Sequence, residues 1–345
     1  MENAPFALSR RSLMGCAVGI GLLSIAPRLE ARKDSTPLFG KVERLDPALD
    51  ALIDAGARVE TIADGFSWSE GPVWVGGRDG YLLASDPRDN VIRQWSPQKG
   101  LRDWLRPSGY AGADADRFRE PGSNGLFLGR GGLVVADSGN RCIGHIDLKT
   151  GRKTVIADRF EGKRFNSPND LCVSPVDGAI YFTDPPWGLK DVEKSSDREM
   201  DYTGVFRIGP DNGVSLIGKY VMPNGIGISP DGRTLYHTDG EIGWVAHSLD
   251  AQGRSIDQRP FLDREAEKIE GPTGDSLKVD QAGNVWLSGL DGLSIVTPQG
   301  KRIGIIRGDD FISNCEIGAD GHLYMTCNHK LARVKVKARK LKSRV

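Results

Sequence analysis

One supersecondary pattern occurs six times along the 345-residue chain: two short strands joined by a glycine-containing turn. The copies span residues 70–86, 123–137, 168–184, 223–239, 274–288 and 314–326. Each copy begins with an acid or amide beside Gly, Pro or Ser, and further short apolar runs such as 204–208 bring the unit to four strands. Such a unit buries its faces only against its neighbours, so the repeat predicts an all-β fold, a six-bladed β-propeller.

The segments outside the repeats complete the expected domain plan. Residues 57–62 precede the first repeat, and we expect them to add an outer strand to the sixth unit. Leu45, Leu49, Leu52 and Ile53 recur at helical spacing, which predicts a short helix over 47–55. The expected parts are an export signal and linker (1–35), an N-terminal segment with a short helix (36–56), the propeller (57–337) and a solvated basic tail (338–345).

The N-terminus resembles a cleavable twin-arginine export signal. Arg10 and Arg11 precede Leu13, Met14 and an apolar run over 15–26. That run is too short for a permanent transmembrane anchor. We therefore expect a periplasmic or secreted protein without a stable membrane anchor.

Charge and cysteine content limit the partners. Lys plus Arg and Asp plus Glu number 46 each, so no net field favours nucleic acid, and a small-molecule partner is expected. Cys142, Cys172, Cys315 and Cys327 lie outside the signal and allow three pairings, with buried free thiols as the alternative. The oligomeric state is open.

The repeat register also predicts a site. Glu70, Asn124, Asn169, Asn224 and Asp275 each begin the first strand of their unit, 45 to 55 residues apart. First strands of blades line the central channel, so these oxygen-bearing side chains should converge there. Two carboxylates with several amides suit one hard divalent cation, calcium first, with magnesium or manganese as alternatives. An isolated Asn at such a position can equally cap a turn.

Roles follow from the chemistry of that cluster. Asp275 is the candidate catalytic base, with a plain metal ligand as the alternative. Asn124 and Asn169 are expected to bind substrate hydroxyls or a developing oxyanion. Trp187 lies in a long connection over 183–202 and could stack on a sugar ring or simply pack. A second long connection, 106–122, is a candidate lid.

Five ordered motifs then identify a family resemblance. They are Glu-Gly-Pro-Val-Trp at 70–74, Asn-Ser-Pro-Asn-Asp at 166–170, Tyr-Phe-Thr-Asp-Pro-Pro-Trp-Gly-Leu at 181–189, Pro-Asn-Gly at 223–225 and Gly-Asp-Ser at 274–276. The chain thereby resembles the gluconolactonase, senescence-marker protein and luciferin-regenerating enzyme family.

The resemblance implies a six-bladed propeller with one catalytic divalent metal, calcium or zinc. It carries the metal ligands onto Glu70, Asn224 and Asp275, and a contact to metal-bound water or substrate onto Asn169. It makes Asp275 the base, and Arg164 is the nearest counterpart of a substrate-binding arginine.

The resulting hypothesis is metal-dependent hydrolysis of a sugar lactone. Two alternatives stand beside it. One is a paraoxonase-type esterase or organophosphate hydrolase, and the other is a non-catalytic periplasmic propeller that binds calcium or sugar.

Overall fold

The computed structural model describes residues 36–54, 56–263, 265, 267, 274–289 and 291–342. The predicted export signal, within residues 1–35, lies outside the described residues. Within the described part, the only helices are three 3₁₀ helices: η1 (Pro47–Ala51), η2 (Ala115–Arg117) and η3 (Val192–Lys194). All other regular elements are strands, which confirms the predicted all-β class.

Four separate antiparallel sheets of four strands follow one another in the chain. The first contains β3 (Glu70–Val75), β4 (Tyr81–Asp86), β5 (Val91–Ser96) and β6 (Gly100–Leu105). The second contains β7 (Ser123–Gly129), β8 (Gly132–Asp137), β9 (Cys142–Ile146) and β10 (Lys153–Ala157). The third contains β13 (Leu171–Val173), β14 (Ile180–Asp184), β15 (Gly204–Ile208) and β16 (Val214–Lys219). The fourth contains β17 (Ile226–Ile228), β18 (Thr234–Asp239), β19 (Gly243–Leu249) and β20 (Ser255–Pro260).

The remaining long strands form one nine-stranded sheet, and β11 (Arg159–Phe160) pairs with β12 (Lys163–Arg164) as a small hairpin. The nine-stranded sheet begins with β21 (Leu277–Val279), β22 (Val285–Gly289), β23 (Gly292–Val296) and β24 (Arg302–Gly308). It continues through β1 (Leu38–Arg44) into β2 (Val59–Asp64), β27 (Lys330–Lys335), β26 (His322–Cys327) and β25 (Asn314–Ile317). β2 therefore pairs with β27, in the place expected for residues 57–62.

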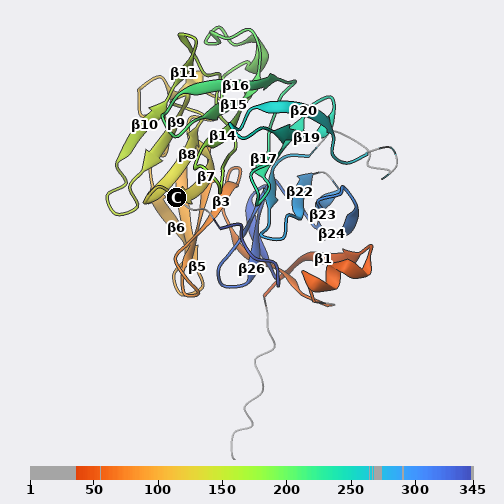
Figure 1. Cartoon of the computed structure of the whole chain (residues 1–345). Coiled ribbons are helices and arrows are strands. Elements are labelled where there is room, and N and C mark those ends of the chain that lie inside the picture. The colour runs from red at the N-terminus through yellow and green to blue at the C-terminus, as the bar shows by residue number, and fades with distance from the viewer. Residues whose placement is uncertain are drawn as a thin grey trace, which may run out of the picture. The chain divides into compact units, whose positions relative to one another are not determined.

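The nine-stranded sheet contains two further runs of four strands, β21 to β24 and β25 to β27 with β2, which brings the number of four-stranded runs among the described residues to six. The first strands of these six runs contact one another in a closed cycle. β3 contacts β7, and the contacts continue through β13, β17 and β21 to β25, which contacts β3 again. In Figure 1 the colour runs from orange at β5 and β6 through green at β15 and β16 to blue at β26, following this order. Every first strand thus has two first-strand neighbours from other sheets.

Apolar side chains fill the spaces between neighbouring sheets. Val73 and Leu83 share a buried cluster with Leu133 and Val135 of the next sheet. These strands are buried over most of their length, which explains their nearly continuous apolar character. Cys142, Cys172, Cys315 and Cys327 are all buried and free, so the thiols pack as small apolar groups rather than forming disulfides.

Close backbone approach between first strands requires glycine. Gly71 adopts φ +43°, and a Cβ there would lie 2.1 Å from the carbonyl oxygen of Asn124. At Gly225, a Cβ would lie 2.4 Å from the Cα of Ser276. Both glycines directly follow predicted site residues, so the local sequence brings the site residues of adjacent units together.

Hydroxyl groups add a second connection between adjacent units. A Ser or Thr near the end of a second strand donates to a backbone carbonyl at the start of the next unit. The pairs are Ser85 to Asn124 O, Thr183 to Asn224 O (2.6 Å) and Thr238 to Asp275 O (2.9 Å). The acceptor residues are the predicted site residues, so this contact positions their backbone.

The expected helix at 47–55 differs from the observed local structure. Residues Pro47–Ala51 form the five-residue η1, in which the Asp46 carboxylate accepts a hydrogen bond from Ala48 N and Leu49 is buried. Pro at the first helical positions and the Asp cap account for its start.

The prediction of a free basic tail is wrong for residues 338–341. Arg339 O accepts a hydrogen bond from Gln281 N, and Lys340 forms a β-bridge with Asp280. Ala338 is buried, and Leu341 packs against a buried cluster containing Ile226. Leu341 also lines a cavity of about 60 Å³ together with residues of β13, β17 and β21. Apolar contacts therefore hold this segment despite its positive charge.

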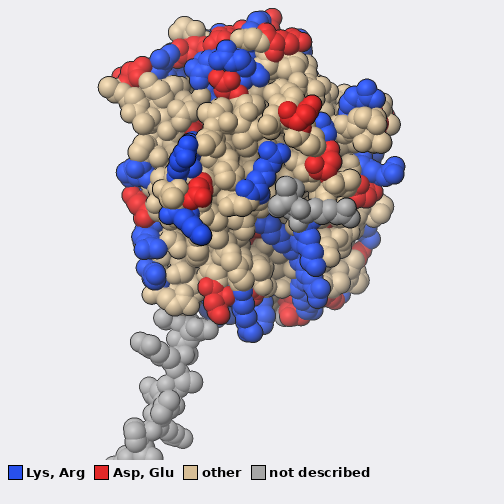
Figure 2. Space-filling view, turned by 60° about the vertical axis from the view of Figure 1, so that its left-hand side comes forward, with Lys and Arg blue, Asp and Glu red and all other residues tan. Residues whose placement is uncertain are grey.

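Charge is mixed on the surface. Figure 2 shows Lys and Arg interspersed with Asp and Glu across the face in view, in keeping with equal totals of 46 each. Within the described residues no helix has both the length and the apolar character needed to cross a membrane.

Candidate functional site

A pocket of about 170 Å³ lies where the first strands begin. Its lining combines carboxylates, amides, arginines and indoles: Trp68, Glu70, Arg88, Arg119, Glu120, Asn124, Asn169, Trp187, Asn224 and Asp275. All five residues singled out by the repeat register line it. They come from five different units, so the fold brings together side chains that are distant in the chain.

Backbone hydrogen bonds between units keep these residues adjacent. Gly125 N donates to Asn169 O at 2.8 Å, and Gly225 N donates to Asp275 O at 2.8 Å. Glu70, Asn124 and Asn169 are only 5%, 3% and 7% exposed, and Asn224 and Asp275 are half-buried. The pocket is therefore a largely buried cluster of oxygen-bearing groups that is more exposed at Asn224 and Asp275.

The carboxylates raise one another's pKa values. Burial, followed by the negative charges of Asp275 and Asp170, raises the pKa of Glu70 well above its usual range. Burial and the charge of Asp170 raise the pKa of Asp275 to about 8, against a hydrogen bond from Asn224 that acts in the opposite direction. The cluster thus holds more negative charge than its surroundings neutralise.

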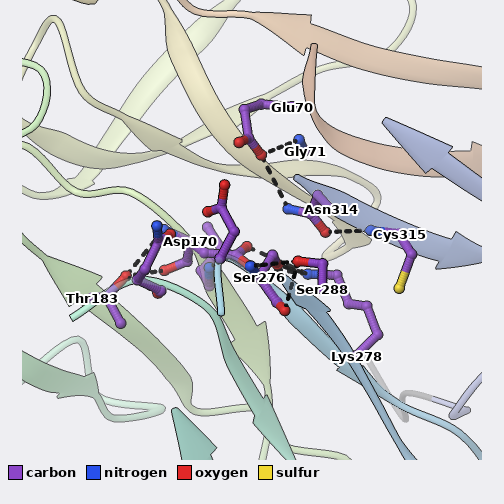
Figure 3. Close-up of polar contacts among 12 residues, drawn as sticks. Glu70, Gly71, Asp170, Thr183, Ser276, Lys278, Ser288, Asn314 and Cys315 are labelled. Atoms are coloured by element: carbon purple, nitrogen blue, oxygen red, sulfur yellow. Dashed lines mark hydrogen bonds and ion pairs between the residues drawn. The ribbon is translucent and has the colours of Figure 1, made fainter. Parts of the chain in front are cut away.

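Two neighbours fix the orientation of Glu70. Trp68 donates its indole N–H to Glu70 Oε1 at 3.2 Å, and Asn314 donates its amide to Oε2 at 3.4 Å. Figure 3 shows Asn314 between Glu70 and Cys315, whose backbone N–H donates to Asn314 Oδ1 at 2.8 Å. Asn314 begins the first strand of the sixth run, so all six runs place an acid or amide at this end.

A buried cluster of three polar side chains, Asp170, Ser276 and Lys278, lies beside the pocket. Asp170 Oδ2 accepts from the Ser276 hydroxyl at 2.5 Å and pairs with Lys278 Nζ at 3.1 Å. Figure 3 shows Asp170, Ser276 and Lys278 on the same side of Glu70. Burial acts to lower the pKa of Lys278, but the negative charge of Asp170 outweighs it and holds that pKa above its usual value.

The two long connections meet at the pocket. Arg119 N and Glu120 N donate to Gly188 O at 2.9 and 3.2 Å, so the 106–122 connection is joined to the segment containing Trp187. Glu120 is 5% exposed, and burial raises its pKa while the charges of Arg119 and Arg88 lower it. These connections supply three of the pocket's side chains, Arg119, Glu120 and Trp187.

The sequence-predicted substrate residues have different locations. Trp187 lines the pocket, and its indole nitrogen is buried without a hydrogen-bond partner among the described residues. Arg164 does not line the pocket; its guanidinium donates to Asn140 O at 2.8 Å. Arg88 and Arg119 are the arginines that line it.

Sequence reasoning missed Trp68, Arg88 and Glu120 as site residues. None of them occupies the repeat position that identified the other five. Trp68 lies two residues before Glu70 in the sequence, which is the only local signal of its place.

The side chains that line the pocket can be compared with those that bind metal ions. Among the described residues, no group of three or more His, Cys, Asp or Glu side chains is arranged to hold a metal ion. Asn oxygens, however, are also ligands for hard cations, and three Asn side chains line this pocket with three carboxylates. Mutually repelling buried carboxylates beside amide oxygens fit a hard divalent cation better than a soft one.

The fold and pocket together define an all-β, propeller-like protein with a buried acid-and-amide site at the start of its innermost strands. The model of the SMP-30/Gluconolactonase/LRE-like region matches residues 68–329. The chain belongs to this family, which confirms the resemblance carried by the five motifs.

Individual relatives agree with this assignment. The chain is 38% identical to a gluconolactonase of Zymomonas mobilis over 351 aligned positions, covering 96% of this chain and 98% of the relative. A gluconolactonase structure from Xanthomonas campestris is 29% identical, with a TM-score of 0.74 over 87% of this chain and 97% of that one. A calcium-binding regucalcin from Agrobacterium tumefaciens, 17% identical, has a TM-score of 0.63 over 84% of this chain and 97% of its own, and shows a likeness of fold alone.

Proposed function

We propose that this protein is a lactonase that hydrolyses a sugar lactone at the pocket lined by Glu70 and Asp275. The observation that carries the proposal is the convergence of five acid or amide side chains from five units on one pocket. Gluconolactonase relatives of nearly the same length support the substrate class.

We further propose that Glu70, Asn169, Asn224 and Asp275 hold one divalent cation, calcium before zinc, magnesium or manganese. A bound cation would polarise the lactone carbonyl and lower the pKa of a nearby water. The raised pKa values of Glu70 and Asp275 support a cation site, because a positive ion would offset the repulsion that causes them.

The chain's own residues would do the rest. Asp275 would accept a proton from the water whose oxygen attacks the carbonyl carbon. The ring C–O bond then breaks, and its oxygen takes up a proton to give the open hydroxy acid. Asn124 and Asn169 would hydrogen-bond the substrate hydroxyls or the carbonyl oxygen. The unpartnered indole N–H of Trp187 would donate to the substrate as its ring covers it.

Two finer aspects, the number of blades and the export of the protein, belong to the same proposal. The closed cycle of first strands supports six blades within residues 57–337. Arg10 and Arg11 support twin-arginine export to the periplasm or beyond. Replacing both arginines by lysine and fractionating the cells tests the route, and undiminished export would contradict it.

The direct test is acid release from glucono-1,5-lactone followed by pH-stat, before and after treatment with a chelator. We expect turnover that the chelator abolishes and calcium restores. Chelator-insensitive turnover would remove the metal from the mechanism. Turnover of aryl esters or organophosphates without lactone turnover would favour the paraoxonase-type alternative, and no turnover at all would favour the binding module.

A further inference from the structure

Two arginines at the pocket form no ion pair within the described residues, although the charge of each acts on the buried carboxyl of Glu120. Arg88 and Arg119 are both exposed and both line the pocket, and neither forms an ion pair in the described part of the chain. Nearby surface arginines such as Arg93 and Arg117 pair with aspartates. Arg88 and Arg119 therefore keep their donors available at the open side of the site.

Each guanidinium is held over an indole. Arg88 lies 4.7 Å from the ring centroid of Trp68, and Arg119 lies 5.6 Å from that of Trp187. Stacking of this kind orients a guanidinium while leaving its edge N–H groups available. Trp68 also donates to Glu70 and stacks on Phe311, with ring centroids 5.9 Å apart, so the Arg88 platform is anchored to the acid cluster itself.

The sum of the charges in the pocket also favours an anionic ligand. Three carboxylates line it: Glu70, Glu120 and Asp275. Two arginines and the divalent cation of the proposed function would exceed them by one positive charge. The neighbouring Asp170 and Lys278 pair with each other and do not alter that difference. A neutral lactone would leave the excess charge in place, whereas an anionic one would cancel it.

We propose that Arg88 and Arg119 form an anion subsite, and that the preferred substrate is a sugar lactone bearing a second, negatively charged group, a carboxylate or a phosphate, remote from the lactone carbonyl. This inference rests on the proposed lactonase function. It names the substrate class of that site. Paired guanidinium donors suit both anions, because each presents two oxygens to an arginine fork.

A matched pair of substrates isolates the effect. Glucaro-1,4-lactone carries a carboxylate where glucono-1,4-lactone carries a hydroxymethyl group, and the ring is the same. We expect a higher kcat/KM for the glucaro-lactone than for the glucono-lactone. In the Arg88→Gln/Arg119→Gln variant, the ratio of these two kcat/KM values should be about tenfold lower, which is the effect of about one charge-assisted hydrogen bond. The same comparison between 6-phosphoglucono-1,5-lactone and glucono-1,5-lactone distinguishes a phosphate preference from a carboxylate preference.

Arg78→Gln is the matched control. Arg78 is exposed, lies in the turn after β3 at the other end of that strand from Glu70, and has no ion-pair partner among the described residues. The ratio should not change in this variant. Equal kcat/KM values for both members of each pair, or a ratio unchanged by the double substitution, would overturn the anion subsite.

A binding measurement separates this inference from the proposed function. Glucarate and gluconate differ by the same carboxylate, and Trp68 and Trp187 lie beneath the arginines, so their fluorescence reports binding without turnover. With calcium present, we expect glucarate to bind more tightly than gluconate, and the double substitution to remove the difference. If no lactone is hydrolysed but this difference is found, the lactonase proposal fails and the anion subsite stands. Equal affinities overturn the subsite whatever the activity.

Discussion

Thr238 donates its hydroxyl hydrogen to the backbone carbonyl oxygen of Asp275 across 2.9 Å. The donor ends the second strand of one unit and the acceptor begins the next, so a site residue is positioned by the neighbouring unit. Gly225 N donates to the same oxygen, which gives Asp275 two fixed backbone contacts.

Thr238→Val should remove one of these contacts without changing the shape of the side chain much. We expect a loss of about 1 kcal/mol in the free energy of unfolding, the usual net value of one buried hydrogen bond, together with a lower kcat. Thr238→Ser keeps the hydroxyl and serves as the control. Urea titration and lactone kinetics measure both effects, and equal behaviour of the Val and Ser variants would contradict the positioning role.

Asp275→Asn should abolish lactone hydrolysis while the protein stays folded. The amide cannot accept the proton of the attacking water, and the pocket loses a carboxylate that repels its neighbours. Without added cation we therefore expect a melting temperature equal to or above that of the wild type. Exposed Asp211→Asn is the control. Retained turnover in Asp275→Asn would exclude Asp275 as the base.

A buried histidine pair predicts loss of stability in acid. His237 Nδ1 and His247 Nε2 lie 3.2 Å apart, and burial lowers the pKa of His247 to about 4 and that of His237 well below its usual range. The unfolded chain takes up these protons near pH 6.5, so the folded state loses stability as pH falls from 6.5 towards 4, by up to about 1.4 kcal/mol per pH unit for each histidine.

His247→Gln tests this acid dependence. Asp184 contributes with the opposite sign, because burial raises its pKa to about 7, but that contribution is common to both proteins. We therefore expect the wild-type and variant unfolding free energies, measured by urea titration at several pH values, to converge as pH falls from 6.5 to 4. A constant difference over this range would contradict the assignment.

The C-terminal segment predicts a coupled pair of substitutions. Lys340 Nζ lies 2.6 Å from Glu316 Oε1, and Glu316 is 5% exposed. Lys340→Ala removes a partly exposed partner of this buried carboxylate, so we expect destabilisation of about 1 kcal/mol, the upper end for a pair screened by solvent. Adding Glu316→Gln should recover part of that loss, and exposed Arg339→Ala should have little effect. Thermal unfolding is measured for the wild type, Lys340→Ala, Glu316→Gln, the double variant and Arg339→Ala, and additive effects of the two single substitutions would refute the coupling.

The repeat predicted the central site because each unit places its first strand in the same way. Glu70, Asn124, Asn169, Asn224 and Asp275 could therefore be identified from register alone. Arg88 and Glu120 could not, since their positions depend on connections whose course is set by contacts such as Glu120 N to Gly188 O. These contacts join segments that no periodic pattern relates.

The tail was misjudged for a similar reason. The composition of this C-terminal tail predicts a solvated segment. Leu341, however, packs against an apolar surface formed by strands that are distant in the sequence. Local charge predicts whether an isolated peptide is solvated. It predicts this less well for a segment that has an apolar surface beside it.

The pairing of β2 with β27 has a consequence for biosynthesis. An incomplete chain that lacks β25 to β27 leaves one edge of β2 without β27, the partner that it has in the finished protein. Unpaired strand edges readily pair with other chains, so stalled or truncated products should aggregate rather than persist as soluble fragments.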